Sequence, residues 1–223
     1  MSTHDSRRWT VPFGRGELSF TLPAGVTGAE VVTRPAAPLA DPVAAASAAI
    51  HSPLGAPALR ELVSGAKSVC IAVTDATRAC PDSLLVPPML SEIAAAGVPD
   101  DSITILIAVG AHRASTDAEK REKLGDAIVN RYRVIDHDGT DDANLVAVMD
   151  GPGGIPFRVN RIAVEADLLL STGLVEPHQY AGFSGGGKTV AVGCGDETTI
   201  GYTHGPAMLD QDGTRLAQLA GNP

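Results

Sequence analysis

Residues 69–78 read VCIAVTDATR, and this stretch determines the expected fold. Its first five residues, Val69 to Val73, form a compact apolar run that predicts a strand buried on both faces of a sheet. The group Asp75-Ala76-Thr77-Arg78 follows it, and a second apolar run, Ile103 to Val109, is followed by Gly110-Ala111-His112-Arg113. Apolar strands separated by helical segments indicate a mostly parallel sheet, which binds ligands at the carboxyl ends of its strands.

Further elements can be placed outward from this stretch. Strands are expected at 132–135, 145–149 and 168–171, and helices at 43–50, 57–63, 84–96 and 116–124. Asp41-Pro42 provides a cap and a first-turn proline for the first helix, whereas Pro87-Pro88 should delay the regular part of the third. Residues 8–22 predict a β-hairpin. The expected fold class is α/β: a mostly parallel, Rossmann-like sheet covered by helices and preceded by a short N-terminal β-hairpin, with all 223 residues in one domain.

Composition argues against several classes of protein. The net charge is −9 and no cluster of Lys and Arg stands out, so we expect neither nucleic acid nor a membrane surface as a partner. The three cysteines have no CxxC spacing, which is typical of thiols in a reducing cytoplasm rather than of a zinc site. The longest apolar runs are too short to span a bilayer.

The segment from Thr172 to His204, TGLVEPHQYAGFSGGGKTVAVGCGDETTIGYTH, is the richest in reactive side chains. Within it, residues 182–189 read GFSGGGKT and fit the P-loop pattern of nucleotide hydrolases. A P-loop requires a buried strand that runs directly into its first glycine. Here the preceding residues 175–181 carry a proline and several polar groups, so a P-loop hydrolase is the less favoured alternative.

The same segment resembles the lactate racemase family. The matching residues are Glu176-Pro177-His178, the run Ala181 to Gly186, Lys188 and His204, together with the DATR and GAHR groups upstream. His137-Asp138 and Val159-Asn160-Arg161 also fall where the family has similar residues. The spacing agrees as well: His112 and His178 are 66 residues apart, Lys188 follows after ten and His204 after sixteen more.

This resemblance implies an isomerase that racemises or epimerises a small 2-hydroxy acid. The family removes the α-hydrogen as hydride, which requires a cofactor because no side chain accepts hydride. That cofactor is a nickel-pincer nucleotide, a pyridinium-3-thioamide-5-thiocarboxylic acid mononucleotide with nickel. By position, Lys188 would carry it covalently and His204 would be the protein ligand to nickel. Enzymes that synthesise the cofactor are implied as partners.

The resemblance also implies roles for the other site residues. His112 and His178 match the catalytic pair, one on each face of the substrate. Gly185, Gly186 and Gly187 would let main-chain amides approach the cofactor, and Arg78 would bind the substrate carboxylate. Asp75 would lie beside the cofactor and orient a histidine or Arg78. We expect His137 to make only a local turn contact.

Two departures from the family leave a further alternative open. Family members are about twice this length, and their second domain closes over the cofactor and supplies substrate contacts. Gly187 stands where other members carry varied residues, often arginine. A non-catalytic cofactor-binding remnant is therefore the third possible function, beside the racemase and the P-loop hydrolase.

Overall fold

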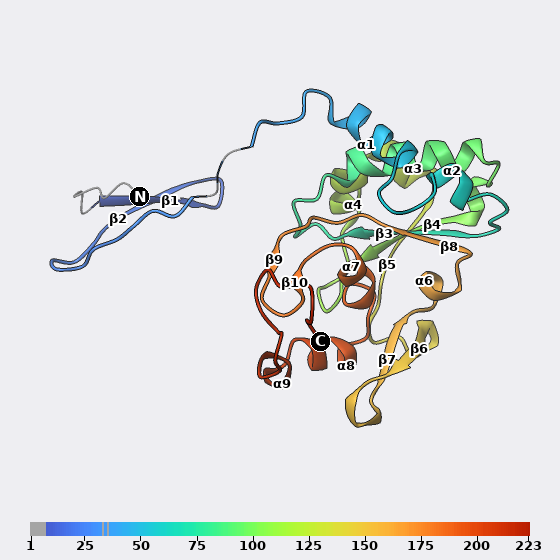
Figure 1. Ribbon diagram of the computed structural model, residues 1–223. Coiled ribbons are helices and arrows are strands. Elements are labelled where there is room, and N and C mark those ends of the chain that lie inside the picture. Colours follow the sequence, from blue (N-terminus) through green and yellow to red (C-terminus); the bar gives the residue numbers. More distant parts are fainter. Residues whose placement is uncertain (1–7, 33, 35) are drawn as a thin grey trace. The chain divides into compact units, whose positions relative to one another are not determined.

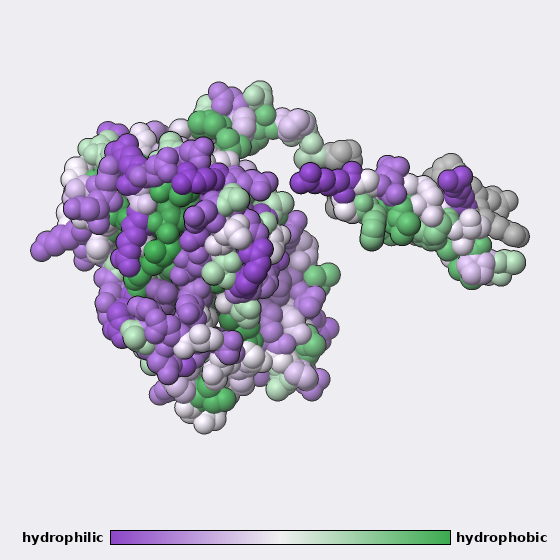
Figure 2. All heavy atoms as spheres, turned by 180° about the vertical axis from the view of Figure 1, so that it is seen from behind, coloured by the Kyte–Doolittle hydropathy of each residue, from purple (hydrophilic) through white to green (hydrophobic). Residues whose placement is uncertain are grey.

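A computed structural model describes residues 8–32, 34 and 36–223 and divides the chain into two compact units, Met1–Ala40 and Asp41–Pro223. In the first unit, β1 (Arg8–Phe13) pairs antiparallel with β2 (Gly16–Thr21), so the predicted hairpin is confirmed. The register places Trp9 opposite Phe20 and Val11 opposite Leu18. Hydrophobic side chains of this hairpin are exposed, as Figure 2 shows.

The second unit is built on a four-stranded parallel sheet with the order β5-β4-β3-β8 (Figure 1). The strands are β3 (Val69–Thr74), β4 (Ile103–Ala108), β5 (Arg133–Asp136) and β8 (Leu168–Ser171). All four were expected from the sequence, and the α/β class is confirmed. The chain moves outward from β3 to β4 and β5 and then returns to the other side of β3. The strand order therefore reverses between β3 and β8.

The alternation of side chains along β3 explains why both faces of the sheet are covered. Val69, Ile71 and Val73 pack against residues of α3 (Asp82–Ala95), α4 (Asp117–Leu124) and α5 (Asp126–Arg131). Cys70 and Ala72 point to the opposite face, where they pack with residues of α6 (Arg161–Glu165) and with Cys194. A strand that is apolar on both faces needs this three-layer arrangement.

The helices follow local capping signals, with two corrections. The side chain of Asp41 caps α1 (Pro42–His51) as expected, and Thr116 forms a capping box with Glu119 at the start of α4. Pro87 and Pro88, however, do not delay α3, which begins at Asp82 and continues through both. Without their N–H groups, the carbonyls four residues earlier receive no helical hydrogen bond from them. The expected helix at 57–63 is reduced to α2 (Leu59–Leu62).

The predicted strand at 145–149 lies outside the main sheet. It is β6 (Leu145–Asp150), which pairs antiparallel with β7 (Pro156–Asn160) across the predicted turn. The chain after β8 forms the short hairpin β9 (Pro177–His178) and β10 (Gly182–Phe183), and then α7 (Gly187–Ala191), α8 (Glu197–Thr203) and α9 (Pro206–Leu209). No helix in the described part of the chain has the length and apolarity to cross a membrane.

Candidate active site

A cavity lies at the point where the strand order reverses, which is where open α/β sheets bind their ligands. It has a volume of about 530 Å³, and a second cavity of about 640 Å³ shares Gly185, Lys188 and His204 with it. The first cavity is also lined by Asp75, Arg78, His112 and His178, and the second by Gly186 and Gly187. The structure thus brings all nine predicted site residues to two adjoining cavities, each within the usual size of a ligand pocket.

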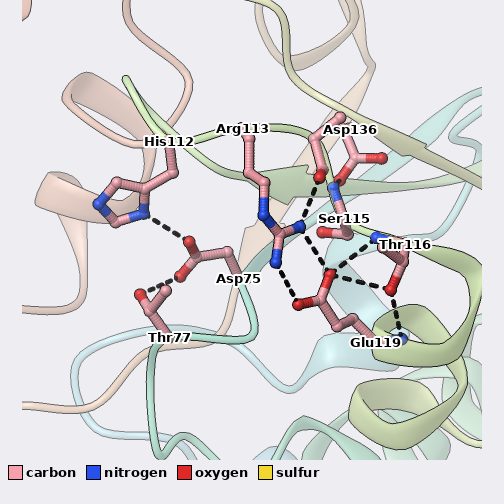
Figure 3. A network of polar contacts seen from close by, with 9 residues as sticks. Asp75, Thr77, His112, Arg113, Ser115, Thr116, Glu119 and Asp136 are labelled. Carbon is pink, nitrogen blue, oxygen red and sulfur yellow. Dashed lines mark hydrogen bonds and ion pairs between the residues drawn. The ribbon is translucent and has the colours of Figure 1, made fainter.

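Asp75 and His112 form a hydrogen-bonded pair at the ends of β3 and β4 (Figure 3). The buried carboxylate of Asp75 lies 2.6 Å from Nδ1 of His112 and also accepts a hydrogen bond from the hydroxyl of Thr77 at 2.8 Å. A carboxylate in this position holds a proton on Nδ1, so Nε2 carries the lone pair. Arg113 points the other way, to Glu119. Asp75 therefore orients the histidine and not Arg78.

Lys123 of α4 holds the loop that carries Asp75 and Arg78. The Lys123 ammonium donates to the main-chain carbonyls of Arg78 and Cys80 and pairs with the buried carboxylate of Asp82 at 3.0 Å. Within the part of the chain that the structure describes, the Arg78 guanidinium has no ion-pair partner. It therefore remains available to a carboxylate ligand in the cavity.

His178 lies in the β9–β10 hairpin and is held by the main chain. Its Nδ1 accepts hydrogen bonds from the main-chain N–H groups of Tyr180 and Ala181, both at 3.2 Å. Burial, together with the positive charges of Lys188, His204 and Arg78, lowers the pKa of His178 to about 4. A neutral ring whose Nδ1 accepts must carry its proton on Nε2.

Lys188 is the second residue of α7 and lies between the two cavities. Burial, together with the nearby charge of Arg78, lowers its pKa from the ordinary lysine value. Among the described residues no carboxylate pairs with its ammonium. A lowered pKa increases the unprotonated fraction of the amine, which is the form that can become acylated.

The geometry of residues 172–189 does not support a P-loop. β8 ends at Ser171, and Gly182 lies in the short hairpin strand β10, so no buried strand runs into this glycine. The hydroxyl of Thr189, which would bind magnesium in a P-loop, is buried and donates to the carbonyl of Thr172 at 3.2 Å. Gly185 and Gly186 have φ values of 74° and 52°, which favour glycine in the loop before α7.

His204 follows α8 as its C-cap residue. Its ring lies against Tyr180 and His178, with centroid distances of 4.9 and 5.6 Å, and its Nδ1 is 3.0 Å from the hydroxyl of Thr203. Burial and the charge of Lys188 lower the pKa of His204, so the ring is neutral near pH 7. A neutral imidazole at the edge of both cavities is a suitable ligand for a transition metal.

His137 has a larger role than the predicted turn contact. It is buried, donates from Nε2 to the carbonyl of Gly195 at 2.9 Å, and accepts at Nδ1 from the side chain of Asn160 at 3.1 Å. Asn160 also binds the carbonyl of Cys194 through its main-chain N–H. These bonds fix the segment between α7 and α8, and so the spacing of Lys188 and His204. The family-like placement of His137 and Asn160 was the only sequence signal for this contact.

The residues present fit a tethered, metal-containing nucleotide. An amine of lowered pKa, an imidazole of lowered pKa and a loop with two glycines in the left-handed region all border the same space. The cavities also provide enough volume for a mononucleotide beside a small acid.

The chain is similar in sequence to two curated lactate racemases. The chain is 36% identical over 173 residues to the lactate racemase of Lactiplantibacillus plantarum, an alignment that covers 78% of this chain and 41% of that protein. It is 30% identical over 217 residues to the lactate racemase of Thermoanaerobacterium thermosaccharolyticum, covering 96% of this chain and 50% of that protein. The chain thus spans about half the length of these curated relatives.

Solved structures show the same likeness. The lactate racemase apoprotein from Thermoanaerobacterium thermosaccharolyticum superposes with a TM-score of 0.81 at 30% identity, over 97% of this chain and 50% of that one. A protein from Thermotoga maritima superposes with a TM-score of 0.61 at 25% identity, over 72% and 42%. The family described as the lactate racemase N-terminal domain matches residues 13–217. Because this match covers nearly the whole sequence, the chain belongs to the lactate racemase N-terminal domain family.

Proposed function

We propose that this chain forms the cofactor-binding catalytic part of a 2-hydroxy acid racemase or epimerase, a lactate-racemase-like isomerase. The observation that carries the proposal is that Lys188 and His204 border the same cavity as His112, His178 and Arg78. Family membership supports it, since the curated relatives are lactate racemases.

The proposed cofactor is the nickel-pincer nucleotide, held covalently by Lys188 and through nickel by His204. When bound, it would supply the hydride acceptor that protein side chains lack. Gly185, Gly186 and Gly187 would leave room for its nucleotide part beside their main-chain amides.

The side chains of the cavity would bind the acid and move its hydroxyl proton. Arg78 would bind the carboxylate through its forked donors. His112 would accept the hydroxyl proton on Nε2, while Asp75 stabilises the positive charge that the ring acquires. His178 would serve the other face of the substrate. In the present form of the ring, Nε2 of His178 carries a proton. Before Nε2 could accept a proton, the ring proton would have to move to Nδ1, which would then lose its hydrogen bonds from the two main-chain amides.

The remaining proposals concern surroundings and extent. We propose that the chain functions as one domain beside a second half like that of its relatives, and in the cytoplasm, where its three free, buried cysteines would stay reduced. Its partners would be a small 2-hydroxy acid and the enzymes that synthesise the cofactor, without nucleic acid or membrane. A cofactor-binding remnant without turnover is the alternative that an activity assay distinguishes.

The first experiment tests the tether. The chain is produced together with cofactor-synthesising enzymes, and its intact mass is measured. We expect an adduct of nucleotide size that is absent from Lys188→Ala and present in Lys67→Ala, a matched change at an exposed lysine. An adduct retained by Lys188→Ala would refute the assignment.

A second experiment tests turnover. The loaded chain and a loaded full-length relative are each given one enantiomer of a 2-hydroxy acid, and optical rotation is followed. We expect racemisation by the full-length relative and a rate lower by orders of magnitude for this chain, since a crevice open to water positions its substrate poorly. An adduct on this chain without any turnover, beside an active full-length relative, would favour a cofactor-binding function.

A further inference from the structure

Two imidazole rings are in contact at the cavity, and their hydrogen bonds place the ring protons on opposite nitrogens. His178 and His204 are in edge contact, with ring centroids 5.6 Å apart. Which of the two can bind a metal depends on the nitrogen that carries the proton in each ring, because a protonated nitrogen has no lone pair to donate. The hydrogen bonds on the far side of each ring decide this.

Thr203 determines the form of His204. The Thr203 hydroxyl donates to the carbonyl of Thr199 at 2.8 Å, with the carbonyl of Ile200 at 3.3 Å, so its single proton is engaged within α8. Toward Nδ1 of His204, 3.0 Å away, the hydroxyl oxygen therefore acts as the acceptor. Nδ1 then carries the proton, and Nε2 keeps a lone pair.

The main chain determines the opposite form of His178. Its Nδ1 already accepts from the N–H groups of Tyr180 and Ala181, so its proton is on Nε2. Binding a metal through Nε2 of His178 would first require that proton to leave, and binding through Nδ1 would break both main-chain hydrogen bonds.

We propose that Thr203 is a positioning residue that selects His204, and not the adjacent His178, as the ligand of a divalent transition metal such as nickel. The inference rests on the proposed function for the identity of the metal, but not for the tautomers. Hydrogen bonds to the far nitrogen of a metal-binding histidine commonly fix its tautomer and orientation. Here the hydrogen bonds within α8 fix the tautomer of His204 in the metal-free chain.

Nuclear magnetic resonance of the metal-free chain tests the tautomers. The chain is labelled with ¹⁵N-histidine, and the protonated nitrogen of each ring is identified near pH 7.5. We expect His204 protonated on Nδ1 and His178 on Nε2. In Thr203→Val, which keeps the side-chain shape but lacks the hydroxyl, His204 should shift toward the Nε2-protonated form, whereas Thr203→Ser should resemble the wild type. Wild-type His204 protonated on Nε2 would overturn the inference without needing any variant.

Metal retention tests the consequence. In the chain loaded with cofactor and then challenged with a chelator, nickel is measured by elemental analysis and the organic adduct by intact mass. We expect Thr203→Val to keep the adduct and hold nickel about 10- to 100-fold more weakly, and Thr203→Ser to restore retention. Equal nickel retention in Thr203→Val would contradict the positioning role. A wild-type chain that never acquires the adduct would count against the proposed function and leave the tautomer test unaffected.

Discussion

Replacing Lys123 with methionine should be among the more damaging single changes in the larger unit. The Lys123 ammonium is 3.0 Å from the carboxylate of Asp82, and the exposed fractions of the two side chains are 9% and 0%. Methionine fills a similar volume but leaves the Asp82 charge, among the residues that the structure describes, with only the hydroxyl of Thr74 and the thiol of Cys80 as donors. The carbonyls of Arg78 and Cys80 also lose the hydrogen bond from the ammonium, and the Cys80 carbonyl keeps one from the main-chain N–H of Asp82.

The expected magnitude follows from this burial. Removing one partner of a buried ion pair costs about 3–5 kcal/mol, because the remaining charge is left uncompensated. For a protein of 150–250 residues, each kcal/mol lowers the melting temperature by about 2–4 °C, so we expect a decrease of roughly 6–20 °C. We expect the loop that holds Asp75 and Arg78 to account for most of this lost stability.

Urea denaturation and calorimetry of the 223-residue chain measure this effect. Glu165→Gln is the control, since it removes an exposed pair with Arg161 that should contribute only about 0.3–0.5 kcal/mol and leaves the bond from Arg161 to the carbonyl of Ala143 in place. The double variant Lys123→Met/Asp82→Asn should recover part of the loss, because the amide carries no charge. A loss below about 1 kcal/mol in Lys123→Met, with an unchanged m-value, would refute the argument that this pair is buried and anchors the loop.

Three further outcomes are expected. The first concerns a full-length relative that carries the equivalent pair. There, the change that corresponds to Asp75→Asn should keep substrate binding but lower turnover by about 10²- to 10⁴-fold, since an amide can stabilise the wrong tautomer of the histidine. Unchanged kcat would argue against the Asp75–His112 pair. Burial lowers the pKa of His137, so its contribution to stability is present above its unfolded pKa near 6.5 and is lost as the pH falls below it. The urea midpoint of the wild type should therefore fall more between pH 7.5 and 5.5 than that of His137→Gln, and parallel curves would contradict this. Gly182→Ala should destabilise the C-terminal region by at least about 1 kcal/mol, because a Cβ there would meet the carbonyl of Gln218 at 1.8 Å on a backbone with φ of 72°. Gly201→Ala, which has open space in α8, is the control and should be neutral or stabilising. Hydrogen exchange and thermal melts measure both variants.

Sequence reasoning located the central elements because their signals are local. The runs at Val69 and Ile103 are predominantly apolar, and Asp41-Pro42 is a cap that needs no tertiary partner. β7 was missed because its run, PFRVN, is short and begins with a proline, and α5 was missed because only Gly125 separates it from α4. The prolines in α3 were misjudged because packing of residues such as Val86 and Leu90 against the sheet outweighs two missing hydrogen bonds.

The site was predicted in residue type but not in geometry. The family spacing identified His112, His178, Lys188 and His204 as site residues. It did not predict the hydrogen bonds that decide which nitrogen of each histidine ring carries the proton. The amides of Tyr180 and Ala181 have no side-chain signature, and the contact of His137 with Gly195 spans 58 residues. Only the folded backbone shows such contacts.

The pairing of β3 with β8 also has a consequence for synthesis of the chain. Val69 lies opposite Leu168, so about a hundred further residues must be synthesised before the second edge of β3 is paired. On the ribosome, β3, β4 and β5 can assemble early, because each neighbour follows closely along the chain. Until Leu168 to Ser171 emerge, this fully buried strand remains an open edge that can pair with another nascent chain. Translation that stalls between these two segments should therefore yield aggregates, while a stall after them should not.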